Sequence, residues 1–512
     1  MEIGIQGSDY IKIYFWRFIS LITGFLSMLI VVPKLSSNVE LFGLYSFCSS
    51  FVLYLTYADI GFLNASTKFA AEEYGKGNAT EEYKIFGFTF CILMIMFMPF
   101  SIFMIFLYLN PELILSNADE NTLSIASNFF LIIGILLPIQ VFFQRLIGLI
   151  LVIRLKDHIF YRVEIFTNLI KISSVFYFFN TSYLIVEYFL FITLMSILSP
   201  IISILVSKRY FKFDFKKLIK SFSISKRYFN KTKELAFSSL FLTIGFIIFY
   251  EIDLLIIGKF IGIKEVGIYA IGFTILNFLR NIVNIFYSPF SQRFNHLIGQ
   301  NKKEELIKMM NKIIDYTVPL FIVSHFILFL SIEKLILLWV GTEYMNSIYI
   351  SQLLIICSLF GFIIQPANHY FMATLNYKYL YILAIVLPVS FLISIMLFIP
   401  SYGFEALAIS KLITTLFAFT ISLFGILGVI KISKIINKWL LPTLGVCLIS
   451  FFLVSFFIEM FNSLNKEVYY LIALVAIIGL IILIGYFVLL ITHKDNRRDI
   501  SKIYKKIKRD IF

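Results

Sequence analysis

Long apolar runs separated by short polar or turn-rich breaks dominate the chain. Each run is close to the roughly 20 residues that cross the hydrocarbon core of a bilayer. The first run has no basic segment before it and no small-residue cleavage site after it, so we expect it to remain as a span. The pattern predicts fourteen transmembrane helices, near residues 13–33, 41–64, 85–109, 124–152, 160–180, 183–206, 234–257, 265–292, 313–331, 347–373, 379–400, 402–430, 439–460 and 468–491.

Composition supports this assignment. The chain is 60% hydrophobic and only 14% charged, whereas soluble domains average about 45–50% apolar and about 25% charged residues. A soluble enzyme, a disordered protein and a disulfide-stapled scaffold are therefore excluded. The four cysteines fall inside apolar runs without metal-ligand spacing, so we expect neither a metal site nor a cofactor. The predicted fold class is an all-α polytopic membrane protein.

The distribution of basic residues predicts the orientation. If residue 1 is cytoplasmic, the outside loops contain only five of the 44 lysines and arginines, six lie within spans, and the remaining 33 lie inside. This bias follows the positive-inside rule, so both termini are predicted to be cytoplasmic, in a bacterial inner membrane. The net charge of +14 is then a property of membrane topology, and no nucleic-acid partner is expected.

The longest inside segment, residues 207–233, carries ten basic residues interleaved with aromatic ones. Such a segment can form an amphipathic helix that lies on the anionic inner leaflet. It can equally be a solvated linker whose charge only sets the topology. The sequence leaves both interpretations open.

The two halves of the chain resemble each other. FGLY at 42–45 recurs as VGIY at 266–269, and Gly75 and Gly299 keep the same offset of 224. PELIL at 111–115 and NTSY at 180–183 match EKLIL at 333–337 and IPSY at 399–402. A period of six spans gives both halves one orientation, with a pseudo-two-fold axis along the membrane normal. The predicted divisions are 1–206, a six-helix lobe; 207–233, the linker; 234–430, a second six-helix lobe; 431–491, two further helices; and 492–512, a basic tail.

This plan of six, six and two spans resembles the multidrug/oligosaccharidyl-lipid/polysaccharide exporter superfamily, in particular bacterial O-antigen or capsule repeat-unit flippases. The similar motifs are ADIGF at 58–62, ELFGLY at 40–45, EVGIY at 265–269 and PSYG at 400–403. The resemblance implies transport by alternating access of two facing bundles. It also implies that arginines on the central axis hold the diphosphate of an undecaprenyl-linked oligosaccharide while the isoprenoid tail stays in lipid.

Polar residues within the spans are the candidate binding residues, because a charge at mid-membrane normally faces protein or water. In span 8, Asn277, Arg280, Asn281, Asn284 and Ser288 recur at helical spacing. This stripe either lines an aqueous cavity or packs against another polar helix.

Spans 1 and 4 contribute two further candidate arginines. Arg17 lies on a smaller stripe that could equally serve close helix packing. In span 4, Gln140 and Gln144 share a helix face, and Arg145 follows Pro138. Arg145 is either a ligand or an arginine that snorkels to the interface.

Three carboxylates are candidates for ion coupling. Glu251 and Asp253 lie in the outer third of span 7, where a partly buried carboxylate could bind and release a proton. A water-exposed interfacial position is the alternative. Asp59 and Arg17 fall at a similar depth, and an ion pair between them is the structural interpretation of both.

Catalytic signatures are absent from the sequence, with no H-E-x-x-H, G-x-S-x-G or phosphate-binding loop. We therefore expect a transporter, not an enzyme. The expected cargo is a lipid-linked oligosaccharide diphosphate, with membrane lipids, H+ or Na+, and polysaccharide polymerase machinery as further partners. A peptidoglycan-precursor or multidrug exporter is the nearer alternative, and a membrane polymerase or glycosyltransferase the more distant one.

Overall fold

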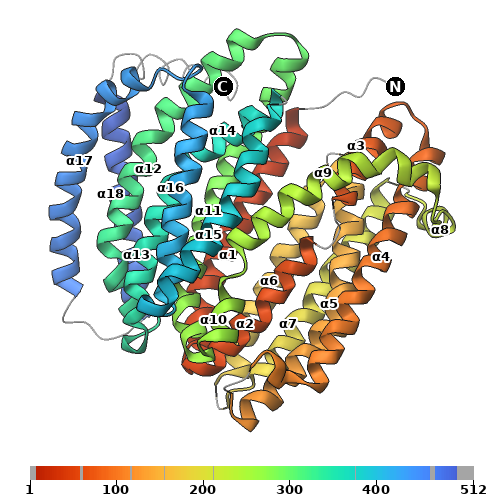
Figure 1. Cartoon of the computed structure of the whole chain (residues 1–512), viewed down its shortest axis with the longest axis horizontal. Helices are drawn as coiled ribbons and strands as arrows, with labels where there is room; N and C mark the ends of the chain where they lie inside the picture. The colour runs from red at the N-terminus through yellow and green to blue at the C-terminus, as the bar shows by residue number, and fades with distance from the viewer. Residues whose placement is uncertain are drawn as a thin grey trace. The chain divides into compact units, whose positions relative to one another are not determined.

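The structure is a computed structural model that describes residues 7–57, 61–115, 118–154, 156–180, 182–211, 213–374, 376–461 and 468–492. Within these ranges every regular element is helical (Figure 1). The chain forms two compact units, Met1–Ala270 and Ile271–Phe512. The boundary falls inside one long helix, α11, and not at the predicted linker. The lobes defined by the sequence repeat remain a prediction.

The first unit contains ten complete helices and the start of α11. They are α1 (Gly7–Leu35), α2 (Val39–Tyr57), α3 (Phe62–Gly75), α4 (Ala79–Leu109), α5 (Glu120–Ile153), α6 (His158–Phe178), α7 (Ile185–Phe211), α8 (Phe215–Lys220), α9 (Lys226–Tyr250), α10 (Asp253–Phe260) and α11 (Ile263–Gly299). In this unit α1 packs on α6, α4 and α7 pack on α5, and α9 packs on α3.

The second unit contains the rest of α11 and seven further α-helices. They are α12 (Lys303–Trp339), α13 (Asn346–Leu359), α14 (Gly361–Ala373), α15 (Tyr377–Tyr402), α16 (Glu405–Ile426), α17 (Ile432–Phe461) and α18 (Val468–Thr492). Here α15 packs on α16, and α17 and α18 pack on α12. The side chains of Lys438 and Trp439 on α17 both donate to the carboxylate of Asp315 on α12, at 2.5 and 2.7 Å, which docks α17.

All fourteen predicted spans coincide with helices. Among the described residues, ten helices are long and apolar enough to cross a membrane, and the pair α13 and α14, bent by 42°, makes an eleventh. The other three predicted spans correspond to the shorter α2, to α6, and to the broken pair α9 and α10. The chain is thus a multi-pass helical membrane protein, and the count of fourteen crossings remains a prediction.

Three span boundaries differ from the prediction. The run 41–64 contains the end of α2 and the start of α3, and Gly61 before α3 has φ +74°, which glycine adopts without steric cost. The run 234–257 is broken at Glu251 and Ile252. The run 265–292 extends as one helix to Gly299, and the position that corresponds to Gly61 is Ile285, a β-branched residue that does not readily adopt the positive φ of Gly61.

The sequence repeat is visible in the helix bounds. Helices α2 and α11 begin 224 residues apart, at Val39 and Ile263, and so do α4 and α12, at Ala79 and Lys303. The single helix α11 covers the stretch that corresponds to α2 and α3, whereas α13 and α14 together correspond to α5. The pairing of PELIL with EKLIL does not hold at this level, because Pro111–Leu113 is a short 3-10 helix and residues 333–337 lie inside α12.

The glycines of the repeated motif explain how α2 and α11 meet. Gly43 and Gly267 lie against each other, with the Cβ of a residue at 267 falling 3.2 Å from the nitrogen and 3.3 Å from the Cα of Gly43. A Cβ at position 43 would overlap the carbonyl of Ile263 and lie 2.9 Å from the nitrogen of Gly267. Only glycine lets these two backbones approach so closely.

Candidate functional site

The two span-7 carboxylates lie at the break between α9 and α10. Glu251 is 6% exposed and Asp253 is fully buried, and their depth in the membrane remains a prediction. The hydroxyl of Tyr54 on α2 donates to the backbone carbonyl of Glu251 at 2.6 Å, and the hydroxyl of Tyr269 on α11 donates to Oδ2 of Asp253 at 3.0 Å. Tyr269 belongs to the repeated VGIY motif. That motif therefore supplies both a glycine for close helix packing and a hydrogen-bond donor to a buried carboxylate.

Arg17 makes an ion pair with a partner that the sequence did not suggest. Its guanidinium donates to Oδ2 of Asp157 at 2.7 Å and lies 5.5 Å from the ring centre of Tyr161 on α6. The side chain of Asp157, just before α6, is 12% exposed. Asp59, the partner expected from depth, lies outside the described residues. Arg17 therefore joins α1 to the start of α6, and a role in binding remains a prediction.

The span-4 candidates lie on α5. Gln140, Gln144 and Arg145 are all half-buried, and α5 continues through Pro138 without interruption. Gln140 and Gln144 are four residues apart and share a face, as expected. The structure thus presents the two amides on one face of one unbroken helix.

In the second unit the polar stripe of α11 is half-buried at one end and exposed at the other. Asn277 and Arg280 are half-buried, and Arg280 donates to the amide oxygen of Asn277. Asn281 and Asn284 are exposed, and the side chain of Ser288 lies outside the described residues. Asn277 thus orients the Arg280 guanidinium, and what the stripe faces remains a prediction.

Lys411 is a cation near this stripe that sequence reasoning left unassigned. It lies on α16, is 1% exposed, and its ammonium sits 4.9 Å from the ring centre of Phe391 and 6.0 Å from that of Phe273. The guanidinium of Arg280 lies 5.7 Å from the same Phe273 ring. Two cations from different helices thus contact one aromatic ring. The sequence signal for Lys411 is a lysine deep within an apolar run. The residues that surround it could not be predicted, because they lie far away in the sequence.

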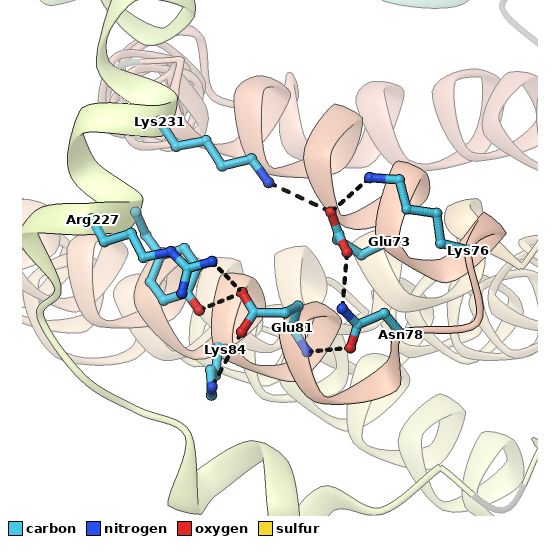
Figure 2. Close-up of polar contacts among 8 residues, drawn as sticks. Glu73, Lys76, Asn78, Glu81, Lys84, Arg227 and Lys231 are labelled. Atoms are coloured by element: carbon cyan, nitrogen blue, oxygen red, sulfur yellow. Dashed lines mark hydrogen bonds and ion pairs between the residues drawn. The ribbon is translucent and has the colours of Figure 1, made fainter.

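A group of charged side chains joins α9 to α3 and α4 (Figure 2). Glu73 on α3 binds Lys76 at 3.0 Å, Asn78 at 3.2 Å and Lys231 of α9 at 3.7 Å. The Lys76 hydrogen bond, with the charges of Lys76 and Lys231, lowers the pKa of Glu73 below its usual value.

The neighbouring carboxylate on α4 is shared in the same way. Glu81 accepts from the Tyr228 hydroxyl at 2.8 Å and pairs with Arg227 of α9 at 3.5 Å and with Lys84 at 3.2 Å. We call these contacts of Glu73 and Glu81 with Arg227, Tyr228 and Lys231 the α9 ionic contact.

A buried ion pair lies next to this contact. Glu82 on α4 is 2% exposed and accepts from Arg154, just after α5, at 2.7 Å. The Arg154 guanidinium also lies 4.8 Å from the ring centre of Tyr74 and 5.0 Å from that of Phe213. This pair joins α3, α4, α5 and the linker around one guanidinium.

Metal ligation is not indicated in the part of the chain that the structure describes, where no three His, Cys, Asp or Glu side chains are grouped as ligands. The polar groups that are grouped there form ion pairs, tyrosine hydrogen bonds and cation–aromatic contacts. These arrangements can hold charged groups and position helices.

Comparison with known proteins places the fold. A family model described as MatE matches residues 14–173, and no curated protein sequence matches the chain. The lipid II flippase MurJ in an inward closed conformation superposes with a TM-score of 0.70 at 16% identity, over 94% of this chain and 98% of the flippase.

Two transporters superpose less closely. An inward-facing multidrug resistance MATE family transporter gives a TM-score of 0.60 at 13% identity, over 85% of this chain and 97% of its own. A MOP superfamily transporter from Pyrococcus furiosus gives 0.54 at 13% identity, over 82% and 95%. The chain therefore shares its fold with the lipid II flippase and with these two transporters.

Proposed function

We propose that this protein is a flippase that moves an undecaprenyl-diphosphate-linked oligosaccharide from the inner to the outer leaflet of the bacterial cytoplasmic membrane by alternating access. The observation that carries the proposal is the stripe of α11, where Asn277 orients Arg280 within a largely apolar stretch of the helix. Hydrocarbon cannot solvate such a stripe, so it must face polar groups or water. A diphosphate crossing the membrane needs fixed donors of this kind.

The choice of arginine fits an anionic cargo. A guanidinium offers a planar fork of donors that matches phosphate oxygens, and it keeps its charge at any working pH. Arg17, Arg145 and Arg280 are the proposed headgroup ligands, assisted by the amides of Gln140, Gln144, Asn277, Asn281 and Asn284. Such a set suits a diphosphate better than a cationic drug.

A peptidoglycan-precursor flippase is the second candidate, because the lipid II flippase has the same fold with a TM-score of 0.70. Both cargoes share the polyprenyl diphosphate and differ in the headgroup beyond it. Binding of matched lipid diphosphates that carry either a sugar alone or a sugar with a peptide distinguishes the two. Preference for the peptide-bearing lipid would favour the second candidate.

The test of the headgroup site is Arg280→Ala in purified protein, titrated with a short-chain polyprenyl diphosphate analogue. Loss of charge-assisted hydrogen bonds worth roughly 1.5–3 kcal/mol should weaken affinity by about 10- to 150-fold. Arg280→Lys should restore part of the affinity, because it keeps the charge and loses the fork. Unchanged affinity in a stably folded Ala variant would remove Arg280 from the site.

Arg162→Ala is the matched control. Arg162 lies in another span, on α6, and its guanidinium sits 4.7 Å from the ring centre of Trp16. It belongs to none of the proposed ligands, so its loss should leave affinity unchanged. Melting temperatures of all variants separate a binding defect from unfolding.

Ion coupling is assigned to Glu251 and Asp253, with Asp59 as a third candidate. The burial of Glu251 and Asp253 at a helix break supports this assignment, because burial favours the protonated form of a carboxylate and so lets it take up and release a proton. Glu251→Gln or Asp253→Asn should abolish gradient-driven transport in proteoliposomes while headgroup binding persists. Full uphill transport by both variants would refute the assignment.

The orientation with cytoplasmic termini is tested by thiol labelling of intact cells. In a background without the native cysteines, Ser116→Cys should react with an impermeant reagent from outside. Ser223→Cys, in the linker, should react only after lysis. Labelling of the linker from outside would invert the orientation.

A further inference from the structure

The part of the linker that lies between α7 and α9 packs two of its aromatic side chains, Phe213 and Phe222, on α4. The Phe213 ring lies 4.9 Å from that of Tyr83 on α4, and Phe222 lies 6.2 Å from Phe90. The Ser221 hydroxyl donates to the Tyr83 carbonyl at 2.7 Å, and its backbone fills the space beside Gly87 where a Cβ would collide. These two aromatic side chains therefore contribute to the packing of the linker on α4.

The opposite side of the linker is cationic and apolar at once. Ile219 and Ile224 are 66% and 71% exposed, although they lie outside every candidate span. Lys216, Lys217 and Lys220 are exposed beside them. We call these five residues the linker outer face. Two exposed isoleucines within a polar segment indicate a partner with an apolar part. The lysines beside them indicate that this partner also carries negative charge.

We propose that the linker outer face binds the anionic lipid headgroups of the adjacent leaflet, with Ile219 and Ile224 inserted at the boundary of headgroups and acyl chains. The position supports a lipid partner, since the linker follows the span that ends at Arg209 and packs on the start of the span that begins at Ala79. Lysines near an anionic surface gain favourable energy individually, and isoleucines supply the buried apolar area.

The experiment places a spin label at Ile219→Cys or Ile224→Cys in a cysteine-free background, in nanodiscs with and without phosphatidylglycerol. The ratio of two collision rates of the label, one with oxygen and one with a water-soluble nickel chelate, reports how deeply the label inserts into the lipid. We expect both labels to be oxygen-accessible in anionic nanodiscs and more nickel-accessible in zwitterionic ones. Lys216→Gln, Lys217→Gln and Lys220→Gln together should remove this lipid dependence.

Lys303→Cys is the control, an exposed residue at the first position of α12, the repeat counterpart of Ala79. Its label should stay nickel-accessible in both lipids. Nickel accessibility of the linker labels in anionic nanodiscs would overturn the proposal, as would insertion that ignores lipid charge. Shielding from both reagents would show that protein covers this face, which also contradicts it.

A second observation concerns the α9 ionic contact (Figure 2). Each carboxylate in it has partners on its own side: Glu73 keeps Lys76 and Asn78, and Glu81 keeps Lys84. Departure of α9 would therefore leave neither carboxylate without a hydrogen bond. Two of the three α9 partners are solvent-accessible, with side-chain exposures of 74% for Arg227 and 35% for Lys231, whereas Tyr228 is 5% exposed.

We infer that this contact opens and closes, with α9 pivoting about its break at Glu251 and Ile252. The far end of the helix is retained, because Tyr54 of α2 holds the carbonyl of Glu251 and α10 packs on α2. The cations of these two ion pairs are accessible to water and salt, which weakens the pairs, so we place the movement at the end of α9 that carries them.

Spin labels at Glu72→Cys on α3 and Asn230→Cys on α9, both exposed, test this inference by distance measurement. We expect two distances, and a shift toward the longer one on adding salt or on replacing Arg227 and Lys231 with Gln. A control pair at Glu72→Cys and Asn128→Cys, on α3 and α5, should give one distance under all conditions. A single α3–α9 distance that neither salt nor the substitutions alter would overturn the inference.

Discussion

Two contacts hold the first helices of the second repeat within the first unit, and they differ in chemistry. The start of α11 meets α2 through Gly43 and Gly267, backbone against backbone. The start of α9 meets α3 and α4 through the α9 ionic contact, at the other end of the α2 and α3 segment. The glycine contact excludes any side chain between the helices, whereas each carboxylate of the ionic contact has alternative partners.

The difference indicates which contact is fixed. Close packing without side chains is lost entirely when two backbones separate, because dispersion falls steeply with distance. An exposed ion pair exchanges its partners for water and local lysines at little cost. Whether a contact is fixed depends on burial as well as on charge. The neighbouring pair of Glu82 and Arg154 is ionic, but it is buried, so we expect it to be a fixed contact.

The largest effect is expected at the buried pair. Glu82→Gln leaves the Arg154 charge without its carboxylate in a site where the two side chains are 3% and 11% exposed, and breaking such a pair costs about 3–5 kcal/mol. Glu81→Gln, one residue earlier on the same turn, is the matched control and should cost far less. Thermal unfolding in detergent measures the stability of both variants. Equal losses of stability would show that burial does not distinguish the Glu82–Arg154 pair from the α9 ionic contact.

A smaller but clear loss is expected at the glycine contact. Gly43→Ala puts a Cβ into the carbonyl of Ile263, and overpacking of this kind costs roughly 1–3 kcal/mol. Gly24→Ala on α1 is the control, because nothing lies within 4 Å of its added Cβ, and it should be neutral or stabilising. A stable Gly43→Ala protein would mean that α2 and α11 can separate freely.

The α9 ionic contact should contribute little at equilibrium. Arg227→Gln and Lys231→Gln should each lower stability by less than about 1 kcal/mol, because exposed pairs rarely contribute more. High salt should erase the difference between wild type and variants. A loss that persists in high salt would place these side chains among the fixed contacts.

The smallest effect is a pH dependence at Glu73. Its folded-state pKa is lowered, first by the Lys76 hydrogen bond, so the stabilisation is complete above the unfolded pKa of about 4.3 and is lost as pH falls through the folded pKa. The melting temperatures of wild type and Glu73→Gln should therefore converge as the pH is lowered from neutral to below the unfolded pKa of about 4.3. Lys76→Gln should weaken this trend.

Much of the fold could be predicted because hydrophobic runs of membrane length have few alternatives. Each predicted run coincides with helix in the described residues, and the FGLY and VGIY motifs located a repeat that the helix starts at Val39 and Ile263 share. The break after Tyr250 was missed because YEIDLL reads as one continuous helix at the level of hydropathy. Its carboxylates were the only signal.

The candidate site was predictable as a set of positions and not as a set of contacts. Arg280 and Asn277 are three residues apart, so helical spacing alone brings them together. Arg17 and Asp157 are 140 residues apart, and Lys411 meets Phe273 from another helix. Pairings of this kind depend on which helix faces pack together.

The sequence by itself determined the membrane class, the helical fold, the internal repeat and the places where polar groups enter the spans. These follow from local composition and periodicity, since a bilayer forces each apolar run to satisfy its backbone within itself. Only the tertiary structure decided that the linker aromatics face α4, that α9 packs on α3, and that Glu251 and Asp253 are buried. Each of these depends on contacts between residues far apart in the chain, where many pairings satisfy the same local pattern.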